Sequence, residues 1–100
     1  MTILVIGTVR LPPENIDRAR AAMETMVAAS RAEEGCLEYA YAEDVADPGL
    51  IRVFEVWRDQ AALDAHFQTP HMAEWRSHWP QFGVSDRRLF AYEIASQHPL

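Results

Sequence analysis

The stretch LIRVFEVW, residues 50–57, decides the fold that we expect for this chain. It is rich in β-branched and aromatic residues, which are typical of a strand. Because side chains alternate between the two faces of a strand, one face carries Ile51, Val53, Glu55 and Trp57 and the other carries Leu50, Arg52, Phe54 and Val56. Both faces are mostly apolar, so we expect both to be covered.

Further elements are predicted on both sides of this strand. Residues 3–11 form a β-branched run that stops at two prolines, and residues 36–45 and 86–95 alternate between apolar and polar positions. In the segment 36–45 the alternation places Leu37, Tyr39 and Tyr41 on one face. Between the first two of these strands, residues 14–34 have apolar positions at helical spacing, and Gly35 follows as a stop signal. The sequence therefore predicts a long amphipathic helix in that place.

Two short helical pieces are predicted after residue 57. Asp59 is a suitable N-cap for a helix over residues 60–68, and Thr69 with Pro70 supplies the cap and first-turn proline of the next helix. The complete order is βαββαβ, an α+β arrangement of the ferredoxin-like type. With 100 residues, we expect one domain over residues 1–100.

The apolar character of both sheet faces predicts a second copy of the chain. In a two-layer α+β fold the helices cover one face of the sheet, and the other face is usually polar. Residues 50–57, 3–11 and 86–95 all depart from this rule. A self-complementary homodimer, with its two sheets face to face as a dimeric α/β barrel, would cover the far faces.

Composition excludes several partners. The net charge is −6 and the chain contains no lysine, so we expect neither nucleic acid nor a membrane as a partner. The apolar start, MTILVIGTVR, is too short to span a bilayer and lacks a basic leader. Cys36 is the only cysteine, which favours the reducing cytoplasm, and we interpret it as a small buried side chain.

Polar residues at core positions mark a candidate site. Glu55 and Trp57 share a strand face, and His66 lies three residues after Leu63 on the buried side of its helix. A second group shares one stripe of the following helix: His71, Trp75 and His78. These residues would line one apolar cavity between sheet and helices.

The same residues also have a purely structural interpretation. A single histidine on an apolar helical face is more often a hydrogen-bonded core residue than a catalyst, and tryptophans at helical spacing are usually core residues. Glu55 is harder to explain in this way, because a buried carboxylate needs a partner or a raised pKa. We predict no metal site, since the break at Pro70 leaves His66 and His71 without a fixed relative geometry.

Two segments resemble the antibiotic biosynthesis monooxygenase (ABM) family, in particular its quinol monooxygenase branch: EEGCLEYAY (33–41) and FEVWRDQAALDAHFQTPHMAEW (54–75). The resemblance implies a dimeric α/β barrel that oxidises a small aromatic quinol or phenol with O₂ and needs no cofactor. It implies that His66 is the base, that Trp57 stacks on the substrate and that Glu55 orients a neighbour. The implied substrate-binding residues are His71, Trp75, Tyr39, Phe67 and Met72.

Departures from other branches narrow the choice. Val53 stands where some aromatic-polyketide oxygenases of the family have asparagine, and Gly7 and Thr8 replace the asparagine of the haem-degrading branch. Haem degradation is therefore disfavoured. Two alternatives stay open, namely a non-catalytic dimer that binds a small ligand and an enzyme that isomerises an aromatic precursor.

Overall fold

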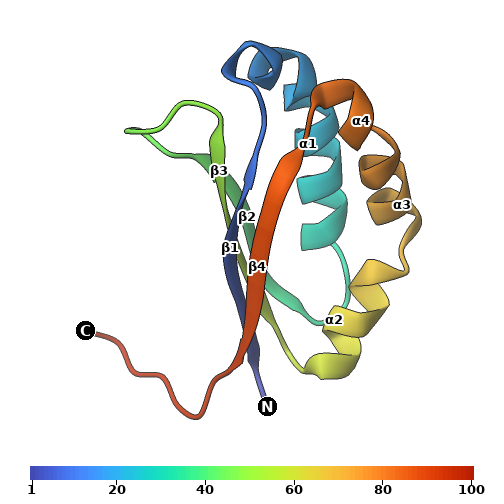
Figure 1. Ribbon diagram of the computed structural model, residues 1–100. Coiled ribbons are helices and arrows are strands. Elements are labelled where there is room, and N and C mark those ends of the chain that lie inside the picture. Colours follow the sequence, from blue (N-terminus) through green and yellow to red (C-terminus); the bar gives the residue numbers. More distant parts are fainter.

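The computed structural model describes all 100 residues. Four strands form one antiparallel sheet in the order β2-β3-β1-β4, and their bounds are β1 Ile3–Arg10, β2 Cys36–Glu43, β3 Leu50–Trp57 and β4 Ser85–Glu93. The helices cover one face of this sheet (Figure 1), and they are η1 Pro13–Asn15, α1 Ile16–Arg31, α2 Gln60–Phe67, α3 Pro70–Ser77 and α4 Trp79–Phe82. The predicted ferredoxin-like βαββαβ order is confirmed, with its second helical segment divided into three pieces.

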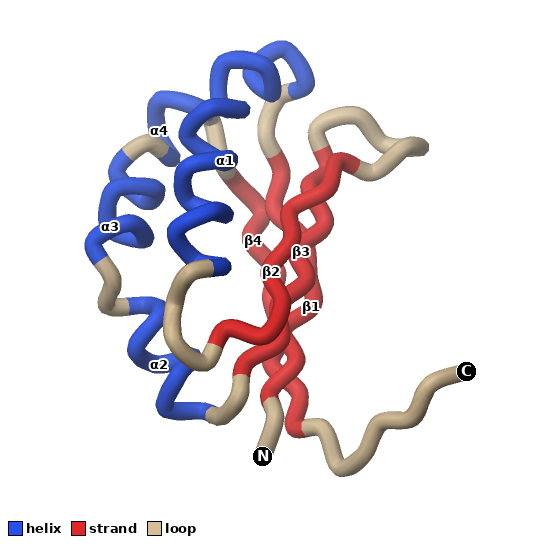
Figure 2. Tube along the Cα trace, turned by 180° about the vertical axis from the view of Figure 1, so that it is seen from behind, coloured by secondary structure: helices blue, strands red, loops and turns tan.

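The two layers are clearest in the view from behind (Figure 2). The helices lie together on one side of the twisted sheet, and the other side of the sheet carries no helix. No helix combines the length and the apolar character that crossing a membrane requires.

Element boundaries differ from the prediction by a few residues at most. The helix predicted over 14–34 is preceded by a 3₁₀ turn and ends at Arg31, because the backbone turns through Gly35 at φ +88° to enter β2. The strands predicted to end at residues 11, 45 and 95 end instead at residues 10, 43 and 93.

Strand β2 contains an irregularity that the sequence pattern did not indicate. Its register against β3 shifts between Cys36 and Glu38, so the alternation of side chains restarts after the shift. Tyr39 therefore points into the core as predicted, whereas Leu37 is 62% exposed. The prediction that Leu37 shares the face of Tyr39 and Tyr41 is wrong for this reason.

The core lies between the helices and one face of the sheet. That face contributes Ile51, Val53 and Trp57 from β3, and α1 contributes Ala19 and Met26. The opposite sheet face is also apolar, as predicted, but it is open to solvent and carries these exposed side chains: Ile6, Phe54, Phe90 and Tyr92. Phe90 alone is 61% exposed.

A well-ordered corner joins α2 to α3. The Thr69 side chain accepts a hydrogen bond from the backbone N–H of Met72 and donates one to the carbonyl of His66 at 2.8 Å. Pro70 occupies the first turn of α3, where its missing N–H costs nothing. The corner therefore holds the end of α2 and the start of α3 in a fixed relation.

Candidate functional site

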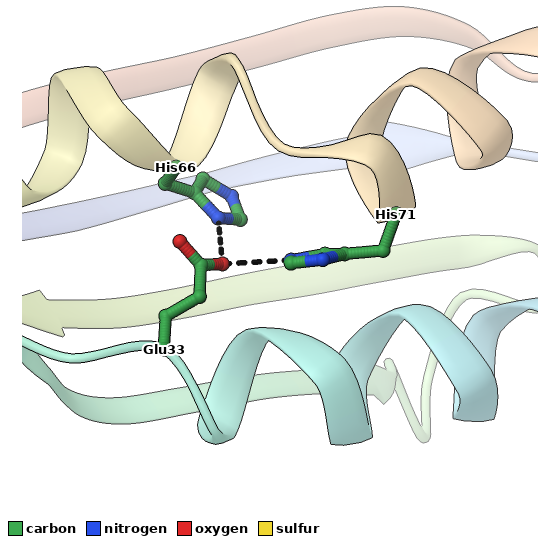
Figure 3. A group of neighbouring side chains, drawn as sticks. All are labelled: Glu33, His66 and His71. Carbon is green, nitrogen blue, oxygen red and sulfur yellow. Dashed lines mark hydrogen bonds and ion pairs between the residues drawn. The ribbon is translucent and has the colours of Figure 1, made fainter.

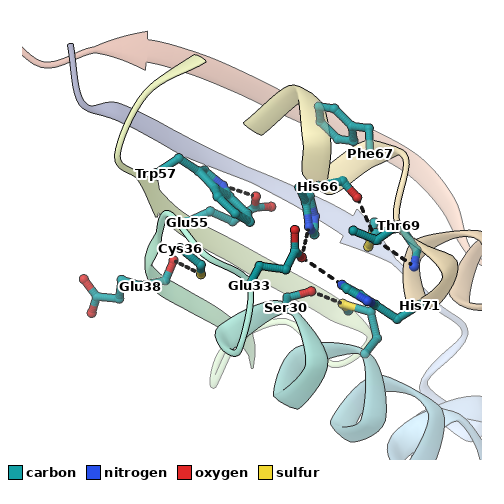
Figure 4. A network of polar contacts seen from close by, with 12 residues as sticks. Ser30, Glu33, Cys36, Glu38, Glu55, Trp57, His66, Phe67, Thr69 and His71 are labelled. Carbon is teal, nitrogen blue, oxygen red and sulfur yellow. Dashed lines mark hydrogen bonds and ion pairs between the residues drawn. The ribbon is translucent and has the colours of Figure 1, made fainter. Parts of the chain in front are cut away.

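The centre of the site is a ring pair between helix and sheet. His66 of α2 and Trp57 of β3 lie with ring centroids 4.7 Å apart, and both residues are 0% exposed. Tyr39 of β2 is 5.3 Å from the His66 ring, and Phe67 is 5.5 Å from it. An imidazole is thus enclosed by aromatic side chains from three elements, and Figure 4 shows it between Trp57 and Phe67.

Glu33 connects this imidazole to a second one. One oxygen of its carboxylate, Oε2, lies 2.6 Å from His66 Nδ1 and 2.8 Å from His71 Nε2 (Figure 3). A carboxylate has no proton to donate, so both imidazole nitrogens must donate to it. We therefore assign the proton of His66 to Nδ1, which leaves Nε2 of the neutral ring with a free lone pair.

The free nitrogen of His66 has no partner. Nε2 is buried and makes no hydrogen bond. Burial lowers the pKa of His66 below its ordinary value, and the hydrogen bond and charge of Glu33 partly offset this effect. The ring is thus held in its neutral form at neutral pH, with one nitrogen available as a base.

Glu55 is the second carboxylate of the site. It is buried and accepts a hydrogen bond from the indole N–H of Trp57 at 2.9 Å. Burial raises the pKa of Glu55 to about 7, although the bond from Trp57 acts in the opposite direction. Glu55 therefore changes charge near neutral pH, while its partner Trp57 does not titrate.

An open cavity of about 270 Å³ lies between α1 and α3. Its lining includes the predicted stripe of His71, Trp75 and His78 together with Ala21, Ala22, Thr25, Met26 and Glu74. His71 faces this cavity and also binds Glu33, so it connects the cavity to the buried His66.

A protein-family model matches most of the chain. The model described as antibiotic biosynthesis monooxygenase matches residues 2–77. The chain belongs to the ABM family. The family resemblance in the sequence is therefore confirmed.

Relatives of this ABM protein span several bacterial groups. A Synechocystis protein, sll1783, is 35% identical over 98 residues, which cover 98% of this chain and 67% of the relative. Rv0793 of Mycobacterium tuberculosis, whose name includes the word monooxygenase, is 35% identical over 75 residues, covering 75% of this chain and 73% of Rv0793. A solved ABM structure from Deinococcus radiodurans has a TM-score of 0.88 at 26% identity and covers 100% of this chain and 98% of its own.

In the structure of this chain, the predicted site residues fall into two groups. One group surrounds the buried imidazole: His66, Trp57, Tyr39 and Phe67, with Glu55 bound to Trp57. The other group lies towards α1 and consists of His71 and Trp75 at the cavity, with Met72 buried in the core nearby. The geometry brings the first group together, and the roles of all these residues stay predictions.

The expected open cavity at His66 is closed in the single chain. Neighbouring side chains leave no exposed surface on His66 or Trp57, because Tyr39 and Phe67 fill the remaining space around the imidazole. Phe67 is the least confined of these neighbours, at 37% exposed. The open space lies instead on the far side of Glu33, at His71.

Glu33 is the functional candidate that the sequence analysis missed. It stands two residues after the end of α1, where the carbonyl end of the helix disfavours an acidic side chain. That unfavourable position, at the start of the EEGCLEYAY segment, was the available signal that Glu33 has a specific partner. The two histidines fulfil this requirement.

The cluster also has the composition of a metal site. One donor atom each from Glu33, His66 and His71 lies within 4.8 Å of the others, so the expectation that the two histidines lack a fixed relative geometry is wrong. However, a metal-bound histidine normally donates its other ring N–H to an acceptor, and His66 Nε2 has none. The cluster therefore fits a hydrogen-bonded network better than a resident metal ion.

Proposed function

We propose that this ABM protein is a cofactor-independent monooxygenase that oxidises a small aromatic quinol or phenol with O₂. The observation that carries the proposal is the buried, unpartnered Nε2 of His66 beside the Trp57 ring. A deprotonated quinol is electron-rich enough to give an electron to O₂ directly. The protein then has to bind the ring, remove a proton and exclude water.

The residues of the site would divide this work. His66 Nε2 takes the proton of the ring hydroxyl, and Trp57 and Tyr39 provide aromatic surfaces on which the substrate ring stacks. Glu55 holds the indole of Trp57. Because Phe67 is partly exposed and lies against His66, a rotation of its side chain opens the way to the imidazole.

The residues at the α1 and α3 cavity would complete the substrate pocket. His71 and Trp75 line this cavity, and Met72 packs behind them in the core. The complete burial of His66 supports the proposal, since radical and peroxide intermediates need protection from water.

We also propose that the active form is a homodimer. The exposed apolar side chains of the far sheet face lie together on β1, β3 and β4. A second copy, packed sheet to sheet as a dimeric barrel, removes this surface from water at a gain of about 25 cal/mol per Å².

The unpaired, partly buried Cys36 suits a reducing cytoplasm.

Sedimentation equilibrium tests the dimer. We expect a dimer at micromolar concentration, and Phe90→Glu should dissociate it because the charge would lie in the apolar interface. Phe67→Glu, which introduces the same charge on the helical side, should leave the dimer intact. A compact wild-type monomer would contradict the proposal.

A second candidate function is a non-catalytic dimer that binds a small ligand. The closed packing around His66 favours it, because Glu55 already binds the indole N–H of Trp57 and Glu33 already binds one ring nitrogen of each histidine. Such a protein would bind aromatic rings without consuming oxygen.

Oxygen uptake distinguishes the two candidates. Purified protein, free of flavin and treated with a chelator, is presented with a panel of hydroquinones, hydroxyquinones and phenols while dissolved O₂ is recorded. The monooxygenase proposal requires uptake in step with product formation for at least one ring class. Binding without uptake across the panel would favour the second candidate, and product without uptake would indicate isomerisation.

A further inference from the structure

One carboxylate oxygen holds two imidazole rings in this protein. Glu33 Oε2 accepts a hydrogen bond from His66 Nδ1 and another from His71 Nε2 (Figure 3). Both rings are constrained by the same atom, although they belong to different helices. A change at either histidine is therefore transmitted to the other through Glu33.

No other side chain is hydrogen-bonded to the His66 ring. The hydroxyl of Thr69 binds the His66 backbone carbonyl, Glu55 binds Trp57, and the hydroxyl of Tyr39 has no partner. The proton position on the His66 ring is thus decided by Glu33 alone. The close-up of the polar network shows the same separation, with Glu55 turned to Trp57 and Glu33 turned to the histidines (Figure 4).

Glu33 needs an anchor to act in this way. It lies in the turn after α1, and a glutamate side chain there has several rotatable bonds whose ordering has an entropic cost. The second hydrogen bond, from His71, holds the carboxylate oxygen where it meets His66. Thr69 and Pro70 fix the start of the helix that carries His71.

We propose that Glu33 is the positioning residue of the site, which fixes His66 in the tautomer with Nε2 free, and that His71 holds Glu33 in place. This inference rests on the proposed role of His66 as the base. With the proton on Nδ1, the lone pair of Nε2 points away from Glu33 into the aromatic enclosure. When Nε2 takes a proton, the adjacent carboxylate stabilises the imidazolium that forms.

The charged and titratable groups around His66 define what a pH titration will report. They come from the turn after α1, from β2, from β3 and from α3: Glu33, Tyr39, Glu55, which is bound to Trp57, His71 and Arg76. Burial lowers the pKa of His66, Glu33 partly offsets this shift, and the charges of His71 and Arg76 add to it. Removal of the Glu33 charge should therefore lower the pKa of His66 further.

Nitrogen-15 NMR of the histidine rings tests the inference without any substrate. The His66 signals are identified by their loss in His66→Gln. We expect the neutral His66 ring of the wild type to carry its proton on Nδ1 almost completely. A wild-type ring with its proton on Nε2 would overturn the inference, and the tautomer itself is read from the wild-type protein.

Charge removal with a matched control provides the second arm. Glu33→Gln should lower the His66 pKa and reduce kcat by on the order of 100-fold, with a much smaller change in KM. Glu34→Gln is the control, since Glu34 is the adjacent residue and its side chain is 92% exposed. Identical His66 titrations in the two variants would contradict the role of Glu33.

The anchor is tested by substitution and rescue. His71→Leu should allow both neutral tautomers of His66 to appear, because Glu33 is then free to move. His71→Gln keeps an N–H donor and should restore the wild-type tautomer. An unchanged tautomer in His71→Leu would remove His71 from the inference.

The outcomes for this inference and for the proposed function are separable. A protein with the Nδ1–H tautomer that consumes no oxygen would contradict the monooxygenase proposal alone. An active oxygenase with the Nε2–H tautomer would contradict the positioning role alone.

Discussion

Glu33 and Glu55 are two carboxylates beside the same buried pair of rings, and their partners differ in kind. Glu55 accepts a single bond from an indole N–H, which does not titrate, whereas Glu33 accepts bonds from two imidazoles, which do. Burial alone therefore does not show which carboxylate takes part in proton chemistry. The two carboxylates differ in their partners, and only Glu33 is bound to side chains that can take up and release a proton.

The largest expected effect is the loss of turnover when His66 is replaced, because the His66 ring has Glu33 as its only hydrogen-bond partner. His66→Gln removes the base and should lower turnover by about 10²- to 10⁴-fold, because general base catalysis typically contributes that much. Oxygen uptake under saturating substrate measures it. His98→Gln is the matched control, since His98 is exposed and lies beyond the end of β4, outside both the imidazole pair and the cavity. Full turnover in His66→Gln would show that His66 is not the base.

The second effect concerns Glu55 and the stability of the fold. Folding raises the pKa of Glu55 from about 4.5 to about 7, so the folded protein holds this proton more tightly than the unfolded chain. The stabilisation that this raised pKa gives to the fold is therefore present in full below pH 4.5 and is lost as the pH rises to 7. Glu55→Gln keeps an acceptor for Trp57 and should stabilise the protein at pH 8 by up to about 3 kcal/mol.

Urea denaturation at pH 4.5 and pH 8 checks this prediction. The difference between Glu55→Gln and the wild type should be present at pH 8 and absent at pH 4.5. The matched variant Glu33→Gln should not stabilise the protein at either pH, since two histidines bind this carboxylate. A stabilised Glu33→Gln would show that the two carboxylates affect the stability of the fold in the same way.

His66 should make a smaller contribution to the pH dependence of the unfolding free energy, and of opposite sign to that of Glu55. Folding lowers the pKa of His66 below 6.5, so the unfolded chain binds a proton that the folded protein resists. This contribution favours folding above pH 6.5 and is lost as the pH falls towards the lowered pKa. In His66→Gln, the fall in unfolding free energy below pH 6.5 should be shallower than in the wild type, as urea midpoints would show.

The smallest expected effect is that of a chelator. If Glu33 joins the histidines through hydrogen bonds, treatment with EDTA should change oxygen uptake by less than twofold. A large loss that Zn²⁺ or Fe²⁺ restores would instead assign Glu33, His66 and His71 as metal ligands. Glu55 would then be the only carboxylate of the site without a metal.

Much of the fold was predictable, because periodicity reports burial. The two apolar faces of residues 50–57 predicted a helix-covered face and an apolar far face, and the far face is open to solvent in the single chain. Leu37 was placed on the wrong face because a strand bulge depends on local hydrogen bonding that alternation does not record. The burial of His66 followed from its helical spacing.

The candidate site was less predictable, since it depends on contacts between distant segments. Glu33 is 33 residues from His66 and 38 from His71 in the chain, and no local spacing relates them. The closure of the space at His66 was also beyond pattern analysis, because it follows from how the Tyr39 and Phe67 rings pack. The residue types indicated acid–base chemistry, whereas the pairing of Glu33 with the two histidines became visible only in the tertiary structure.

The corner at Thr69 and Pro70 limits how the chain length can vary at this place. Connections between helices usually tolerate insertions, but one extra residue within α3 before His71 would turn that imidazole by about 100° around the helix axis. It would then point away from Glu33, and the two rings would lose their common oxygen. The five-residue interval from His66 to His71 therefore acts as a spacer of fixed length.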